Sequence, residues 1–148
     1  MLRSALPLAA CLLGGFPALA QAPAPPPVLD CTETFTKTAD QAALVKRFGR
    51  ENAIVGQLDG AEGQTERGTI LFPKDPTRRV EVFWWDTKGL RRPASVVVRD
   101  KSRWVVRAAG DADRTIGVGT PVAGVEAANG KPFAINGFQW DMGGYGTD

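Results

Sequence analysis

Four side chains suited to molecular recognition lie close together near the end of the sequence: Phe138, Trp140, Asp141 and Tyr145. Aromatic rings supply flat apolar surface, and a carboxylate beside a tryptophan can accept hydrogen bonds from hydroxyl groups. The glycines among them allow the backbone to approach a ligand closely. We therefore expect this segment to contact a ligand or a partner, with a simple glycine-rich turn as the alternative.

Two further tryptophans, Trp84 and Trp85, are adjacent in a segment with strand character. Adjacent strand residues point to opposite faces, so one ring is expected in the core and the other under a helix or on the surface. Tryptophan is frequent at binding hot spots, which makes the pair a candidate platform for a sugar ring or a partner protein. Core packing and cross-strand pairing explain the same residues without a ligand.

Basic residues recur in the predicted loops in the middle of the chain. If these loops gather at one end of a sheet, they form a patch for anionic glycans, lipid headgroups or an acidic partner. Exposed charge at a sheet edge also discourages aggregation, which accounts for the pattern without a ligand. The residues are Arg78, Arg79, Lys88, Arg91, Arg92, Arg99, Lys101 and Arg103.

The sequence lacks the residues that several kinds of catalytic and ligand-binding site require. Histidine is absent from all 148 residues, which excludes triads, general bases and metal ligands that use imidazole. Asp111 and Asp113 begin like a calcium loop, but the sixth position is Ile116 and the twelfth is Val122, where glycine and a bidentate glutamate are needed. Residues 117–119 lack the remaining glycines of a dinucleotide site. We expect no metal and no cofactor.

A carboxylate pair is the remaining route to catalysis. Cleavage of a glycoside needs two carboxyl groups roughly 5–10 Å apart across a cleft. Glu81 and Asp141 are the conceivable members, and nothing in the sequence brings them together. Ser95 and Ser102 lack a nucleophile-elbow motif. The sequence therefore favours a protein that is not an enzyme.

Residues 1–20 have the pattern of a secretory signal: one cation, Arg3, then a short apolar run and small residues before a cleavage site after Ala20. The run is too short, and too interrupted by glycine and proline, to span a bilayer as a helix. Residues 8–11 also match a lipobox, so a lipid anchor at Cys11 is the rival interpretation. In either case the protein is expected outside the cytoplasm, in the periplasm or secreted.

Cleavage after Ala20 leaves 128 of the 148 residues, with 17 basic and 16 acidic side chains. This near balance argues against a nucleic-acid partner, which usually requires a basic excess. One cysteine, Cys31, remains, so no internal disulfide is expected. The proline-rich residues 21–30 are predicted to be a polyproline spacer, and residues 31–148 a single domain.

Capping residues predict two helices. The first extends from Ala39 to Phe48, opened by a capping box at Thr38–Gln41 and closed by Gly49. The second is short, begins at Thr120-Pro121 and ends at Asn129-Gly130.

Alternating apolar residues and intervening turn formers predict antiparallel strands. We expect an α+β fold, with one antiparallel sheet of about five or six strands and both helices on one face, built either as two helix-plus-hairpin units or without a repeat. The predicted strands are 53–57, 68–72, 79–86, 94–99, 103–108 and 132–141.

The C-terminal sequence resembles a family of uncharacterised exported bacterial proteins and lipoproteins. The specific matches are residues 129–133 (Asn-Gly-Lys-Pro-Phe) and 137–144 (Gly-Phe-Gln-Trp-Asp-Met-Gly-Gly), with looser similarity upstream at residues 48–49, 68–73 and Trp84. This resemblance implies an exported location and a fold, and no activity. The helix with Gly-x-Gly-Thr before it also resembles β-lactamase-inhibitor-like envelope domains, a likeness of topology that implies protein binding.

Together these patterns predict an exported, non-enzymatic binding domain of the bacterial envelope. Its expected partner is an envelope or secreted protein, for example a hydrolase that it inhibits. Binding of cell-wall glycan is the second hypothesis, and a carboxylate-based hydrolase is the third.

Overall fold

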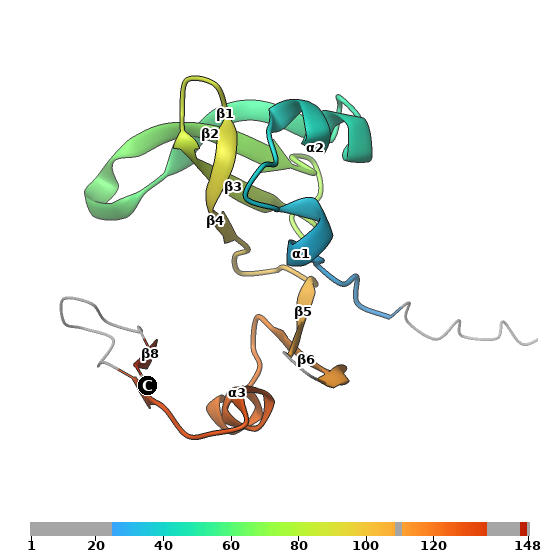
Figure 1. The fold of residues 1–148 in the computed structure, drawn as a ribbon, viewed down its shortest axis with the longest axis vertical. Coiled ribbons are helices and arrows are strands. Elements are labelled where there is room, and N and C mark those ends of the chain that lie inside the picture. The colour runs from blue at the N-terminus through green and yellow to red at the C-terminus, as the bar shows by residue number, and fades with distance from the viewer. Residues whose placement is uncertain (1–24, 109–110, 136–145, 148) are drawn as a thin grey trace, which may run out of the picture.

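The computed structural model describes residues 25–108, 111–135 and 146–147, and its α+β class confirms the predicted fold class (Figure 1). The helices are α1 (Cys31–Thr34), α2 (Gln41–Phe48) and α3 (Val122–Asn129), with a 3-10 turn, η1 (Ala61–Gly63). The strands are β1 (Ala53–Asp59), β2 (Thr65–Leu71), β3 (Val80–Asp86), β4 (Arg91–Val97), β5 (Val105–Ala108), β6 (Asp111–Gly117), β7 (Ala134–Ile135) and β8 (Gly146–Thr147).

Short connections join neighbouring strands as antiparallel pairs, as their spacing predicted. The first four form one sheet in chain order, β1-β2-β3-β4. The others form two-stranded sheets, β5-β6 and β7-β8. The described strands are therefore divided among three sheets, whereas the sequence predicted one sheet of about five or six strands. Strand β6 and helix α1 were not anticipated from the sequence.

One face of the four-stranded sheet carries the main core. Alternation places Leu71, Val80 and Val82 on this face, where they pack with Leu44 of α2. In Figure 1 both α1 and α2 lie to the right of the sheet. Burying this apolar face is the main stabilising contribution that the four strands and α2 share.

The opposite face carries a smaller cluster of Leu58, Ile70 and Phe83. Gly68 makes this cluster possible, because a Cβ at that position would collide with the Leu58 side chain and lie 2.8 Å from the Val82 carbonyl oxygen. The Leu58 side chain of β1 can therefore lie directly against the backbone of β2 at Gly68.

Helix α2 begins two residues later than predicted. Its N-cap is Asp40, whose carboxylate accepts a 2.8 Å hydrogen bond from the Ala43 N–H. The predicted cap was wrong: the Thr38 hydroxyl instead lies 3.3 Å from that of Thr36. An aspartate directly before the first turn is well placed to accept from its free N–H groups, and its negative charge is favourable at the N-terminus of a helix. Gly49 ends the helix with a φ of 90°, as expected.

Helix α3 also begins differently from the prediction. Pro121 is its N-cap, and no side chain caps it. The Thr120 hydroxyl instead accepts a 3.0 Å hydrogen bond from the Gly117 N–H. Thr120 therefore closes the turn after β6, while Gly130 ends α3 in the left-handed conformation as expected.

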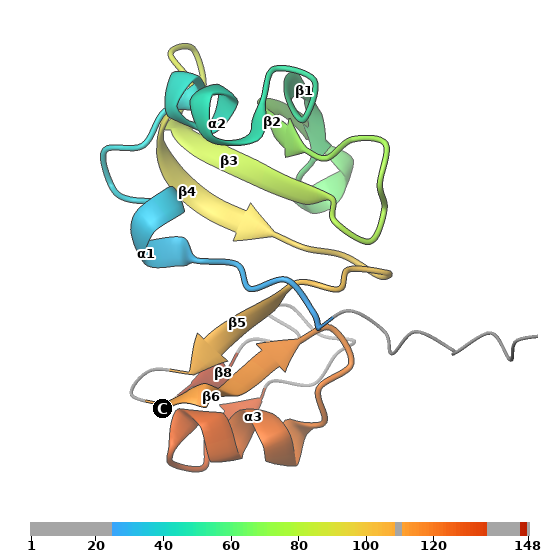
Figure 2. The same cartoon turned by 90° about the vertical axis from the view of Figure 1, so that its right-hand side faces the viewer.

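The N-terminal segment joins the two parts of the structure. Leu29 is 8% exposed within the main core, so folded contacts begin before the expected domain boundary at Cys31. Val28 forms a parallel bridge with Val105, and the Leu29 N–H donates to the Val105 carbonyl. In Figure 2 this segment passes between the four-stranded sheet and the β5–β6 hairpin. Of the predicted strand 132–141, the structure describes β7; residues 136–141 lie outside the described residues.

Candidate functional site

A groove of about 770 Å³ lies between α2, β1 and the turn that joins β3 to β4. Among the described residues, apolar side chains and four cations line it, with Asp40 as the one carboxylate. The apolar residues are Ala42, Val45, Ala53, Ile54, Val55 and Leu90. The cations are Lys46, Arg50, Arg67 and Lys88.

A series of three hydrogen bonds, buried at its Trp84 end, fixes α2 against the sheet at this groove. The Trp84 indole N–H donates to the Thr69 hydroxyl at 3.0 Å, and that hydroxyl donates to the side-chain oxygen of Gln41. The Gln41 amide nitrogen then donates to the Ala53 carbonyl at 2.9 Å. Each polar side chain in this series of hydrogen bonds has a partner. The first turn of α2 is therefore tied to β1, β2 and β3.

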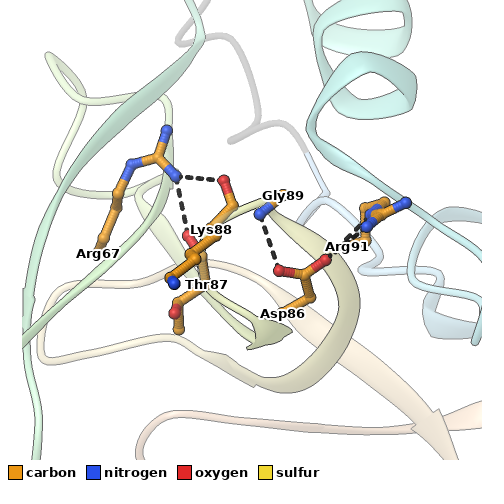
Figure 3. A network of polar contacts seen from close by, with 6 residues as sticks. All are labelled: Arg67, Asp86, Thr87, Lys88, Gly89 and Arg91. Carbon is orange, nitrogen blue, oxygen red and sulfur yellow. Dashed lines mark hydrogen bonds and ion pairs between the residues drawn. The ribbon is translucent and has the colours of Figure 1, made fainter.

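The β3–β4 turn forms a second wall of the groove, held by the network in Figure 3. The Asp86 carboxylate accepts from the Gly89 N–H at 2.8 Å and from two nitrogens of Arg91 at 2.8 and 3.0 Å. The Gly89 hydrogen bond is the main reason that the pKa of Asp86 lies below its ordinary value, and Arg91 lowers it further. These three hydrogen bonds to one carboxylate hold the two sides of the turn together.

Arg67 reaches across from β2 to the same turn. One guanidinium nitrogen donates to the carbonyl oxygens of Thr87 and Lys88, both at 2.8 Å (Figure 3). Leu90 follows with a φ of 50°, unfavourable for a leucine, and its buried side chain contributes to the main core. Packing in the core thus offsets backbone strain in the turn.

The charge of the groove is strongly asymmetric. The carboxylate of Asp40 already accepts a hydrogen bond from the start of α2. Lys46, Arg50 and Lys88 have no ion-pair partner within the described ranges. The groove therefore presents a positive rim around an apolar floor, which suits an anionic ligand with apolar side chains.

The sequence patterns singled out Lys88 among these cations and missed Lys46, Arg50 and Arg67. No usable signal connected Lys46 with Arg50, because the helix ends at Phe48 and a spacing of four residues places two side chains on one side only within a helix. Arg67 had no such signal either, because only the sheet pairing brings it to the turn.

The adjacent tryptophans lie on opposite faces, as predicted. Trp84 is 3% exposed within the main core, and Trp85 is 73% exposed. By alternation Trp85 lies on the face opposite to α2, so the two rings do not form a joint platform. Trp104 is buried in the core and donates its indole N–H to the Arg78 carbonyl at 2.7 Å. The other predicted contact residues, Phe138, Trp140, Asp141 and Tyr145, lie outside the described residues.

Glu81 lies in a second cavity of about 340 Å³, on the face of the sheet opposite to α2. Its side chain is 9% exposed, and its two oxygens accept from Arg79 at 3.1 Å and from Arg99 at 3.0 Å. Arg99 also donates to the Asp59 carbonyl, which ties the segment after β4 to the end of β1. Both carboxylate oxygens are therefore engaged in a structural ion-pair cluster, and the supposed catalytic partner Asp141 lies outside the described residues.

The predicted basic residues do not form one patch. Arg79, Arg99 and Lys101 line the Glu81 cavity, whereas Lys88 lies in the α2–β1 groove. Arg78 stacks its guanidinium 3.8 Å from the centre of the Phe72 ring, and Arg91 pairs with Asp86. The remaining two are Arg92 and Arg103, both exposed.

Within residues 25–108, 111–135 and 146–147, no three His, Cys, Asp or Glu side chains are grouped closely enough to hold a metal ion. The same residues contain no helix with the length and apolar character that a membrane span requires.

Comparison with protein-family models, with curated proteins and with solved structures finds no match to this chain.

Proposed function

We propose that the protein is an exported binding domain without catalytic chemistry, and that it holds an acidic segment of a partner protein in the α2–β1 groove. The observation that carries this proposal is the composition of the groove, with four cations and one already-engaged carboxylate around an apolar floor. Charged rims of this kind steer a partner and determine its orientation, while the apolar floor contributes affinity.

A protein segment suits this groove better than a sugar. Sugar sites commonly offer an exposed aromatic ring, and no aromatic side chain is among the described residues that line the groove. Aliphatic side chains such as Val45 and Val55 fit the apolar side chains of a peptide, and carboxylates along the same peptide fit Lys46 and Arg50.

The binding proposal is tested by reversing charges on the rim. The probe is a fluorescein-labelled peptide that repeats Glu-Thr-Val-Thr, so that an extended chain presents glutamate and valine in turn on one face. Fluorescence anisotropy is the readout. We expect the double variant Lys46→Glu and Arg50→Glu to weaken binding on the order of 10-fold or more, and added salt to weaken binding to the native protein. The matched control reverses two exposed lysines outside the groove, Lys37→Glu and Lys74→Glu. Equal affinities of the two double variants would contradict the proposal.

Export is tested separately in the source cell. The secretory pattern of residues 1–20 supports a mature chain that begins at Gln21. Fractionation followed by mass spectrometry of the N-terminus is expected to find this species outside the cytoplasm. Recovery of a chain that begins at an acylated Cys11 would support the lipoprotein alternative, and an intact cytoplasmic chain would exclude export.

Binding of cell-wall glycan is the second candidate, because the large ring of Trp85 is exposed on a sheet face. Such a ring can stack on a sugar. Addition of soluble peptidoglycan fragments should then change the tryptophan fluorescence of the native protein and leave that of Trp85→Ala unchanged. An equal response from both proteins would rule out Trp85 as the contact.

A further inference from the structure

Strand β1 is an edge of the four-stranded sheet and pairs with β2 on one side. Within the described ranges no strand pairs with its other side. Its side chains Ile54 and Val55 are 38% and 43% exposed. Proteins usually protect such an edge with proline, a bulge or inward charge, and β1 has none of these between Ala53 and Leu58.

The pairing register shows which backbone groups face outward. The Phe72 N–H donates to the Asn52 carbonyl at one end of the hairpin, and the Gly60 N–H donates to the Gln64 carbonyl at the other. In an antiparallel pair, every second residue directs its N–H and C=O toward the partner strand. The even-numbered residues of β1 therefore bond to β2, and the odd-numbered residues direct their backbone groups away from the sheet.

Side chains occupy the two ends of this outward row. The Ala53 carbonyl accepts from the Gln41 amide at 2.9 Å, and the Asp59 carbonyl accepts from Arg99 at 3.2 Å. Between them, the N–H and C=O of Val55 and Gln57 have no hydrogen-bond partner among the described residues. The open part of the edge thus has two donors and two acceptors, in the pattern that another strand would match.

We propose that the partner segment binds as an additional β-strand along the outer edge of β1, with main-chain hydrogen bonds to Val55 and Gln57. This inference rests on the proposed function, because the open edge borders the same groove: Val55 lines it. Side chains on one face of the added strand would lie on the apolar floor. Carboxylates beside them would reach Lys46 and Arg67.

The charges of the groove favour an acidic segment of another protein over a second copy of this chain. Pairing two β1 edges would bring two positive rims together, and like charges at close range oppose association. An acidic strand instead neutralises the rim cations as it covers Ile54 and Val55.

The first test changes one outward backbone donor. Proline at residue 57 removes an N–H that the β1–β2 pairing does not use, so Gln57→Pro is compatible with an edge strand. Gln57→Ala is the matched control, because it removes the same side chain and keeps the N–H. With the labelled glutamate–valine peptide, we expect Gln57→Pro to bind at least about 10-fold more weakly than Gln57→Ala. Equal affinities in two folded variants would overturn strand addition.

The second test leaves the protein unchanged, in case Gln57→Pro does not fold. Two versions of the same peptide carry N-methyl groups on alternate residues, either all odd or all even positions. A strand added to β1 directs every second N–H toward it, so one version should lose affinity by at least about 10-fold relative to the other. Equal loss from both versions would overturn the proposal.

The outcomes separate this inference from the function on which it rests. If Lys46→Glu with Arg50→Glu weakens binding and both backbone tests show no difference, the groove binds an acidic segment by side chains alone. If the charge reversals have no effect, the proposed function itself fails. Concentration-dependent dimers of the native protein that Gln57→Pro abolishes would instead identify a second copy as the occupant and overturn the choice of an acidic partner.

Discussion

The indole nitrogen of Trp84 lies 3.0 Å from the hydroxyl oxygen of Thr69, and both side chains are buried. This contact begins the hydrogen-bonded chain that continues through Gln41 to the carbonyl of Ala53 and anchors α2 beside β1. The geometry of the groove therefore depends on a polar network within the core of the sheet.

Thr69→Val is expected to lower the free energy of unfolding by about 1–3 kcal/mol. The substitution keeps the side-chain shape but leaves the Trp84 N–H and the Gln41 oxygen without their buried partner. Urea denaturation followed by tryptophan fluorescence measures this change. Thr65→Val, at an exposed position of the same strand, is the control and should change stability by less than about 0.5 kcal/mol. Similar values for the two variants would show that the network contributes little.

Gly68→Ala is expected to destabilise the protein by about 1–3 kcal/mol, because the added Cβ needs space held by Leu58 and by the Val82 carbonyl. Gly60→Ala provides the comparison, since the nearest atom to a Cβ there is the Gln64 carbonyl at 3.4 Å. Thermal unfolding of both variants tests the difference. A Gly68→Ala protein as stable as the native one would mean that Leu58 does not lie as close to Gly68 as described.

The ion pair of Glu81 with Arg99 is expected to be stronger than that of Asp86 with Arg91. Glu81 is 9% exposed, whereas Asp86 is 24% exposed and its arginine 65%. Double-mutant cycles with glutamine or asparagine replacements should give about 1–2 kcal/mol for the first pair and a smaller value for the second. The reverse order would contradict the structural role assigned to Glu81.

Acid is expected to destabilise the fold through three aspartates whose pKa values lie below the ordinary 3.8. The main causes are the Glu33 N–H for Asp30, the Thr77 hydroxyl for Asp75 and the Gly89 N–H for Asp86. A lowered pKa in the folded state adds stability above the unfolded pKa, and this stability is lost as pH falls through the folded pKa.

The melting temperature should therefore decline as the pH falls below about 4. Asp86→Asn should decline less steeply over the same range, because it lacks one of the three titrating groups. The variant should also lose peptide affinity at neutral pH, since the β3–β4 turn loses its charge-assisted bonds to Arg91. Parallel pH profiles for Asp86→Asn and the native protein would show that this carboxylate does not contribute.

Cys31 is expected to react slowly with alkylating reagents at neutral pH. Partial burial, with an added effect of the Asp30 carboxylate, raises the pKa of its thiol above the ordinary 9.0. The thiolate is the reactive form, so a raised pKa lowers the reactive fraction. The rate of reaction with iodoacetamide as a function of pH, compared with that of a free cysteine peptide, tests this. A faster rate in the protein at pH 7 would contradict it.

Much of the local structure could be predicted from the sequence because it depends on contacts between near neighbours. Alternation placed Trp84 and Trp85 on opposite faces, short turns made the strands antiparallel, and Gly49 and Gly130 ended their helices. Where two capping residues competed within a few positions, the prediction chose Thr38 over Asp40, because capping preferences differ by only a few tenths of a kcal/mol. The secretory pattern at the N-terminus is likewise a property of sequence alone.

The lining of the groove could not be predicted from the sequence, because only the tertiary structure brings its residues together. Lys46, Arg50, Arg67 and Lys88 come from a helix, the loop after it, a strand and a turn, and no local pattern connects them. The same holds for the open edge at Val55 and Gln57, since any strand could have been the outer one. Sheet order and helix docking arise from burial of the whole apolar face, a cooperative effect spread over many residues, and such effects leave no signature in a short stretch of sequence.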